Sequence, residues 1–160
     1  MMIETMTMNT MTTSETHLEQ LSATMGLPLS FDEGVCTIAL DDALIICITN
    51  DVDRGAWMIS ALLADEGQME TLDPQVCLYM NFLLHMRDLG AIALTDRYGP
   101  MFLVHRLPVV QMSHDDVVSR MEDFIEAWRL VKLRLFFPER ADDNQSAESD
   151  SDIGREIFVV

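Results

Sequence analysis

Short apolar runs alternate with acidic or glycine-containing turns through the middle of the chain, between Phe31 and Pro108. Such runs, rich in β-branched and aromatic residues and bounded by turn residues, predict strands. The predicted strands are Val35–Leu40, Leu44–Ile48, Ala56–Leu63, Ala91–Thr95 and Met101–Arg106. Short turns join the first three, and this favours an antiparallel meander.

The first of three predicted helices precedes the strands. Thr16 and Glu19 have the spacing of a capping box, so we expect the helix to begin near Ser14 or Thr16. Gly26 is placed to end it in a left-handed conformation, and Pro28 prevents its continuation. A narrow apolar stripe indicates a peripheral helix that either lies partly exposed at the edge of a groove or simply packs on the sheet.

The other two helices have clear start signals. Asp73 and Pro74 suit the N-cap and the first position of a helix that runs to Arg87. Ser113 is a good N-cap for the longest helix, which Pro138 ends. The order is therefore helix, three strands, helix, two strands, helix, which predicts an α+β fold with an antiparallel sheet.

Composition divides the chain into three parts. We expect a disordered, Met- and Thr-rich leader over residues 1–13, one folded domain over 14–137, and a flexible acidic tail over 138–160. The domain is long enough to bury a sound core.

The second predicted helix is apolar on almost every side. One sheet covers only one face of such a helix, and a second copy of the same helix is the simplest cover for the other. The sequence therefore predicts a homodimer. Cys77, Met80, Asn81 and Leu84 share one helical face, which we assign to the dimer interface together with Ile92 and Leu94. The opposite assignment of the helix faces stays open.

Charge restricts the partners. The chain has 27 Asp and Glu against 10 Lys and Arg, a formal charge of −17, whereas nucleic acids and anionic membranes attract clustered Lys and Arg. We expect neither as a partner, and no segment is apolar for long enough to enter a membrane. The leader lacks the features of a secretory signal, and the three scattered cysteines suit a reducing cytoplasm.

Residues with catalytic potential do not form a recognisable motif. There is no glycine-rich phosphate loop, no HExxH and no GxSxG, and the four histidines are scattered. We expect no enzyme, no cofactor and no metal site. The 13 methionines, five of which lie in the leader, suit a surface that accepts several apolar partners. Together these features predict a protein that holds a polypeptide.

Several segments, in order and spacing, resemble the class I type III secretion chaperones, the Tir-chaperone-like family. The resemblance covers roughly Leu18 to Trp128. Its segments are Leu21–Leu29, Asp32–Ile38, Leu78–Phe82, Gly90–Asp96, Leu107–Pro108 and Phe124–Trp128.

This resemblance implies a cytoplasmic bacterial chaperone that dimerises mainly through the second helix and the following strand. Its partner would be the amino-terminal segment of a secreted effector, bound in extended form through apolar patches and sheet-edge pairing and delivered to the secretion ATPase. A methionine-rich groove would suit several effectors, as in the broad-range chaperones of plant-pathogen systems. The leader and the acidic tail depart from the family pattern, so no role is carried onto them.

Two apolar patches are our candidates for effector binding: Leu18, Leu21, Met25 and Leu27 form the first, and Trp57 and Ile59 the second. An alternative is a regulatory domain of the same fold that binds another bacterial protein. A third hypothesis, an enzyme with an unrecognised site, requires a deep pocket with convergent polar groups.

Overall fold

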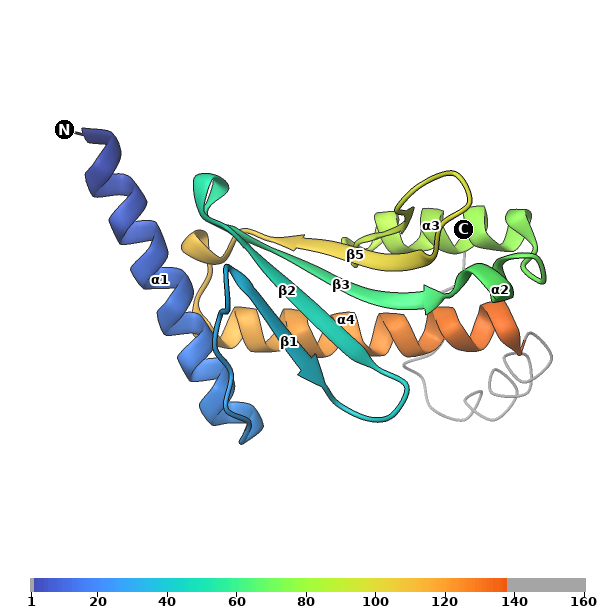
Figure 1. Cartoon of the computed structure of the whole chain (residues 1–160), viewed down its shortest axis with the longest axis horizontal. Coiled ribbons are helices and arrows are strands. Elements are labelled where there is room, and N and C mark those ends of the chain that lie inside the picture. Colours follow the sequence, from blue (N-terminus) through green and yellow to red (C-terminus); the bar gives the residue numbers. More distant parts are fainter. Residues whose placement is uncertain (1, 138–160) are drawn as a thin grey trace.

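The computed structural model describes residues 2–137, and their side chains from residue 13 onward. Its helices are α1 (Met2–Met25), α2 (Glu66–Met69), α3 (Pro74–Met86) and α4 (His114–Phe136), with 3-10 turns η1 (Val52–Arg54) and η2 (Val109–Gln111). The strands are β1 (Val35–Ala39), β2 (Ile45–Asp51), β3 (Ala56–Ala64), β4 (Ala91–Leu94) and β5 (Met101–Leu107). Figure 1 shows their arrangement.

The five strands form one antiparallel sheet in the order β1-β2-β3-β5-β4. The prediction of an α+β fold with an antiparallel sheet and a β1-β2-β3 meander is confirmed. Asp41 makes the first turn as expected, since its Oδ1 accepts from the backbone N–H groups of Ala43 and Leu44 at 2.8 and 2.7 Å. These bonds lower the pKa of the Asp41 carboxyl.

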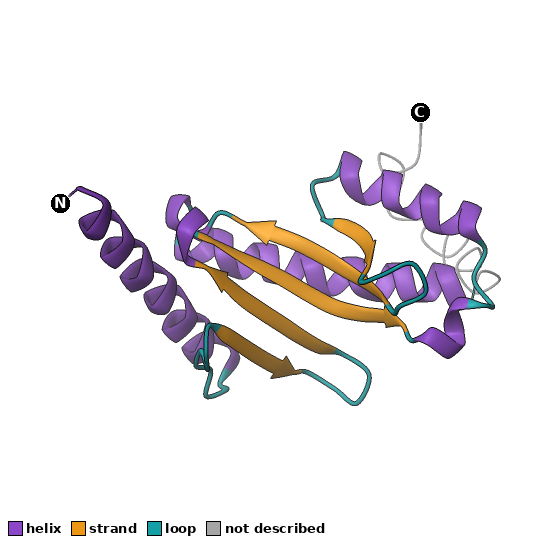
Figure 2. Cartoon of the chain, turned by 45° about the horizontal axis from the view of Figure 1, so that its top comes forward, coloured by secondary structure: helices purple, strands orange, loops and turns teal. Residues whose placement is uncertain are grey.

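The helices cover one face of the sheet, and the core lies between the two layers (Figures 1 and 2). The α4 helix packs on β3 and β5 and contacts α1 and α3. The α3 helix lies beside the β4 edge, where Asn81 Oδ1 accepts from the backbone N–H of Ile92 at 2.8 Å. Gly90 connects the two at φ 105°, and its backbone lies so close to Val104 that a side chain would collide with it.

The first helix differs from its prediction. It begins at Met2, so it includes the segment that we expected to be a disordered leader, and Thr16 lies inside it rather than at its start. No Gly or Pro interrupts the sequence before Gly26, so nothing local requires a helix start at Ser14. Gly26 ends the helix at φ 66°, as predicted. The domain limits of 14 and 137 stay a prediction, and the acidic tail lies outside the described residues.

The other helix starts match their sequence signals. Asp73 accepts from Gln75 N–H, Pro74 occupies the first turn of α3, and Ser113 forms a capping box with Asp116 at the start of α4. The acidic loop after β3 contains α2, a short helix that the sequence reading missed. Asp65 and Gln68 form its capping box.

Two side chains of α4 bind carbonyl groups at the end of β3. The pairing of β3 with β5 shifts register between Leu62 and Ala64. Trp128 Nε1 donates to Leu62 O and Lys132 Nζ donates to Leu63 O, each at 2.8 Å. Burial lowers the pKa of Lys132, and the ammonium lies 5.0 Å from the ring centre of Phe136. These bonds fix α4 on the sheet where the strand is irregular.

Replacing Trp128 by Phe is expected to lower the free energy of unfolding by about 1–3 kcal/mol, because a part-buried hydrogen bond is lost while the ring is largely kept. Urea unfolding followed by circular dichroism measures this change. Glu126→Ala, an exposed change on the same helix, is the control and should be nearly neutral. Equal stability of the two variants would show that the bond to Leu62 O contributes nothing.

Among the described residues, no helix is both long and apolar enough to cross a membrane.

Candidate functional site

One face of the sheet carries no helix (Figure 2). In the pairing of β2 with β3, Ile46 lies opposite Ala61 and Ile48 opposite Ile59, and all four are buried against the helices. The alternate residues point to the uncovered side. We call this side the outer face. On its three central strands it consists of Ile45, Cys47, Thr49, Met58, Ser60, Leu62, Phe102, Val104 and Arg106.

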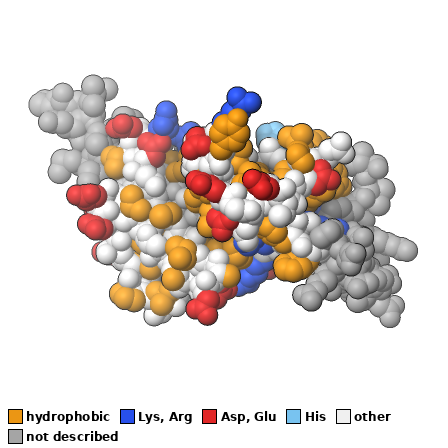
Figure 3. Space-filling model, turned by 45° about the vertical axis from the view of Figure 1, so that its right-hand side comes forward, with side chains coloured by type: hydrophobic (Ala, Val, Ile, Leu, Met, Phe, Trp, Pro, Cys, Tyr) orange, Lys and Arg blue, Asp and Glu red, His pale blue; other side chains and the backbone are white. Residues whose placement is uncertain are grey.

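The outer face is largely apolar and exposed. The side chains of Ile45, Leu62 and Met58 are 55%, 42% and 39% exposed. A hollow of about 260 Å³ lies beside them on β3, β5 and β4, with Phe102 and Val104 in its lining. An uncovered sheet face of this kind indicates a surface for an apolar partner. Figure 3 shows other exposed hydrophobic side chains standing among acidic ones.

The second exposed apolar surface belongs to α3. Leu78 is 70% exposed and Phe82 55% exposed, and Tyr79 and Met86 are exposed as well. Leu94 of β4 is also exposed. We call these five residues the α3 surface. The α3 helix is apolar on almost every side, and the α3 surface is the side that no other part of the described chain covers.

The residues assigned to the dimer interface differ in how far they are buried. Met80 and Leu84 are buried within the chain and pack in the core, so they are not part of an exposed surface of α3. Cys77 and Asn81 are half-buried, Cys77 packs against the core, and Asn81 binds Ile92 of β4. Of the assigned set, only Leu94 is exposed. The exposed apolar side of α3 is therefore the opposite face of the helix, which the sequence left open as the alternative assignment.

Some residues of the two predicted effector patches are buried, and others are accessible. Leu18, Leu21, Trp57 and Ile59 are at most 3% exposed and belong to the core, so they are not surface anchors in this structure. Met25 is half-buried, and Leu27 is exposed just after α1. Residues that the sequence reading missed, Met58 and Leu62, alternate with Trp57 and Ile59 on β3. The alternation of side chains along a strand places Met58 and Leu62 on the face opposite Trp57 and Ile59. It does not indicate which of the two faces a helix covers.

Trp57 anchors α1 to the sheet. Its Nε1 donates to Ser14 Oγ at 2.7 Å, and Ser14 Oγ donates to Asn50 Oδ1 at 2.9 Å. The rings of His17 and Phe31 pack edge-on against the indole, with centres 6.5 and 6.1 Å away. The aromatic residue that the sequence singled out is therefore a structural contact between layers.

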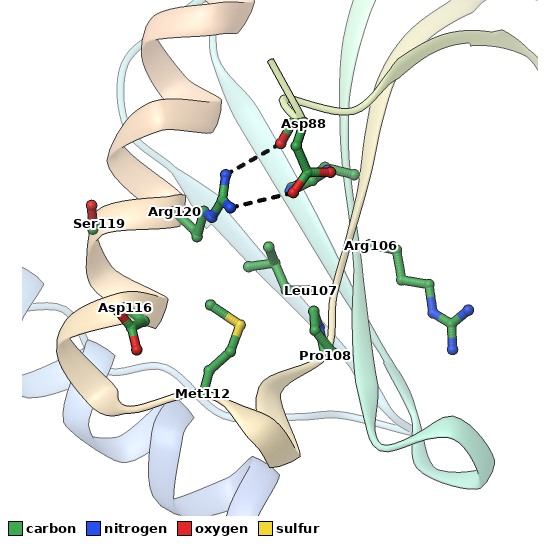
Figure 4. Close-up of a pocket in the computed structure, with 9 residues that line it drawn as sticks. Asp88, Arg106, Leu107, Pro108, Met112, Asp116, Ser119 and Arg120 are labelled. Atoms are coloured by element: carbon green, nitrogen blue, oxygen red, sulfur yellow. Dashed lines mark hydrogen bonds and ion pairs between the residues drawn. The ribbon is translucent and has the colours of Figure 1, made fainter. Parts of the chain in front are cut away.

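A polar cavity of about 300 Å³ lies between α4, β5 and the turn after α3 (Figure 4). Arg120 of α4 reaches to Asp88, where Nη1 donates to the backbone oxygen and Nη2 to Oδ2, both at 3.3 Å. His105 of β5 lines the cavity, and burial lowers the pKa of its imidazole.

The remaining chemistry-bearing residues stay apart. Cys36 is buried, Cys47 and Cys77 are half-buried, and all three are free thiols. Burial raises the pKa of Cys36 and Cys77, which keeps these thiols protonated. Within residues 13–137, no three His, Cys, Asp or Glu side chains converge as metal ligands would.

Comparison with known proteins yields similarity at the level of structure. No protein-family model and no curated protein matches the sequence. A chain of the HopA1–SchA chaperone–effector complex is 22% identical with a TM-score of 0.62, over 75% of this chain and 93% of that one. A chain of the ExsC–ExsE complex is 15% identical with a TM-score of 0.63, over 76% and 92%.

A third similar structure is the Yersinia pestis type III secretion chaperone SycH in complex with a stable fragment of YscM2. It is 15% identical with a TM-score of 0.55, over 73% of this chain and 98% of that one. At these identities the similarity shows the fold. The chain therefore has the fold of type III secretion chaperones.

Proposed function

We propose that this chain, which has the fold of type III secretion chaperones, is a cytoplasmic bacterial chaperone for secreted effectors. It binds the amino-terminal segment of an effector, keeps that segment competent for export, and presents the complex to the secretion ATPase. It works by binding and not by catalysis, and needs no cofactor.

The outer face is the observation that carries this proposal. A soluble fold rarely leaves the central strands of its sheet exposed with Ile45, Met58 and Leu62 on one side. Flexible methionine and aliphatic side chains accept different apolar segments. The structures with the same fold include complexes of chaperones with effectors. Met25 and Leu27, the accessible part of the first predicted patch, are proposed to extend the contact.

We propose further that the chaperone is a homodimer that joins two copies of the α3 surface. This surface contains two aromatic and three aliphatic or thioether side chains on adjacent elements, and a two-fold axis would place each against its copy. Aromatic side chains at the centre of such an interface carry much of its binding energy. The outer face then stays free for the effector.

Replacing Leu62 by Glu is expected to weaken effector binding at least about tenfold, because a carboxylate on the outer face loses its hydration when an apolar segment covers it. The measurement coexpresses the chaperone with candidate effector amino termini, purifies the complex, and determines affinity by calorimetry. Leu130→Glu is the matched control, since Leu130 is 40% exposed on α4 and lies off the outer face.

Equal binding by the two variants would remove the outer face as the effector site. A complex with two chaperone chains and one effector segment would support the whole proposal. Capture of a regulator in place of every effector tested would instead favour the regulatory alternative.

A further inference from the structure

The polar cavity beside α4 has an apolar floor and a charged rim. Leu107, Pro108 and Met112 form the floor, and Figure 4 shows them below the Arg120–Asp88 pair. Arg106 contributes to the lining, but its side chain extends away from Arg120 in this view and lies on the outer face of the sheet. At about 300 Å³ the cavity is large enough for one long side chain.

His105 is a buried polar residue that opens into this cavity. It is only 8% exposed, and it lines the cavity wall from β5. Among the residues whose side chains are described, the imidazole makes no hydrogen bond, and its nitrogens are not enclosed as the unpaired Nδ1 atoms of His17 and His114 are. Its ring nitrogens are therefore available to a polar group that enters the cavity.

The charges around the cavity favour a cation. Asp88 and Asp116 line the cavity, and Asp123, outside the lining, acts electrostatically on His105. The Arg120 guanidinium acts on the pKa of His105 in the opposite sense to Asp88 and Asp123. Burial lowers the pKa of His105 and so favours the neutral ring, which accepts a hydrogen bond. Because the Arg106 side chain extends away from Arg120, the charged side chains that meet at the cavity are Asp88, Asp116 and Arg120, two carboxylates and one guanidinium.

We propose that this cavity is a binding subsite for one basic side chain, arginine or lysine, of the bound polypeptide. The aliphatic stem of that side chain packs on Leu107 and Met112, and its cationic end lies between Asp88 and the imidazole of His105. The outer face provides apolar contacts for the polypeptide. The subsite adds one polar contact at another place on the surface, which fixes how the polypeptide is aligned. The proposal depends on the proposed function only for the polypeptide origin of the side chain.

The charges that line the cavity favour a cationic side chain over an anionic one. The Arg120–Asp88 pair is neutral as a unit, so the remaining lining carboxylate, Asp116, repels an entering carboxylate and attracts a cation. A guanidinium or ammonium meets an overall attractive field, and the chain's formal charge of −17 acts in the same direction.

The test uses small probes and the full chain, without any effector. N-acetyl-arginine methylamide, its neutral isostere N-acetyl-citrulline methylamide, and N-acetyl-glutamate methylamide are titrated separately. The His105 ring resonances are followed by NMR. We expect the arginine probe to shift these resonances saturably at millimolar concentration and to lower the pKa of His105. The citrulline probe should bind more weakly by about three- to tenfold, the factor of one lost charge interaction at a partly solvated site.

Two substitutions should act in opposite directions. Asp88→Asn keeps the shape of a residue at φ 53°, a conformation that Asn tolerates, and should weaken arginine binding about three- to tenfold. Arg120→Gln removes the resident cation and frees Asp88, so it should strengthen binding. A matched change outside the cavity, Asp42→Asn, should leave the affinity unchanged.

Saturable binding of arginine with this ordering of variants would support the subsite. Equal binding of arginine and citrulline, preference for the glutamate probe, or no shift at His105 would each overturn it. Because no effector takes part, failure here leaves the chaperone proposal standing, and failure of effector binding leaves this result intact.

Discussion

Replacing Phe82 by Asp is expected to convert a dimer into a monomer. Phe82 lies at the middle of the α3 surface and is 55% exposed in the single chain, so a charge there costs little in the monomer. In a symmetric interface each aspartate would be buried near its copy, with the loss of two aromatic anchors. Hot-spot residues of this kind contribute about 2–4 kcal/mol, which raises the dimer dissociation constant at least roughly thirtyfold.

Light scattering and sedimentation measure the result. At micromolar concentration the unmodified chain should have the mass of a dimer, twice 18.1 kDa. The Phe82→Asp variant should have the mass of one chain, 18.1 kDa. Val110→Asp is the control, because Val110 is an exposed apolar residue on η2 and not on α3 or β4. A thermal melt should show that both variants stay folded. A monomeric unmodified chain, or a dimer that survives Phe82→Asp, would refute the α3 surface as the interface.

Replacing Trp57 by Ala is expected to lower the free energy of unfolding by about 3–5 kcal/mol, through loss of buried contacts and the cavity left behind. The change also removes the donor to Ser14 Oγ, which joins α1 to β3. With about 2–4 °C per kcal/mol for a chain of this size, the melting temperature should fall by roughly 6–20 °C.

Two further variants make the result specific. Trp57→Phe keeps a ring but loses the hydrogen bond, and should cost about 1–3 kcal/mol. Met58→Ala, one residue along on the outer face, should change stability little and act on effector binding instead. If Trp57→Ala stayed as stable as the unmodified chain and only lost its effector, the sequence assignment of Trp57 as a surface anchor would be restored.

The fold was largely predictable because its signals are local. Asp73 and Pro74 begin α3, Ser113 begins α4, and alternating apolar runs define the strands. These signals depend on backbone chemistry within a few residues, so they act before any tertiary contact forms. The length of α1 was missed for the same reason, since no local stop or start separates Met2 from Ser14.

The candidate site was predicted only in outline. The sequence indicated a polypeptide-binding protein with an apolar second helix, but it placed Trp57, Ile59, Met80 and Leu84 on surfaces, and the fold buries them. Periodicity groups residues by face. It does not state which face meets another layer, because that depends on where α1 and α4 pack.

The sequence by itself determined the order of the elements, most of their limits, the excess of acid and the lack of a recognisable catalytic motif. Only the tertiary structure decided which side of the sheet stays open and which side of α3 is exposed. It also brought Asp88, His105 and Arg120 together around one cavity. Local signals act between neighbours in the chain, whereas these features come from packing between segments that are distant in sequence, such as Asp88 and Arg120, 32 residues apart, and Leu63 and Lys132, 69 residues apart.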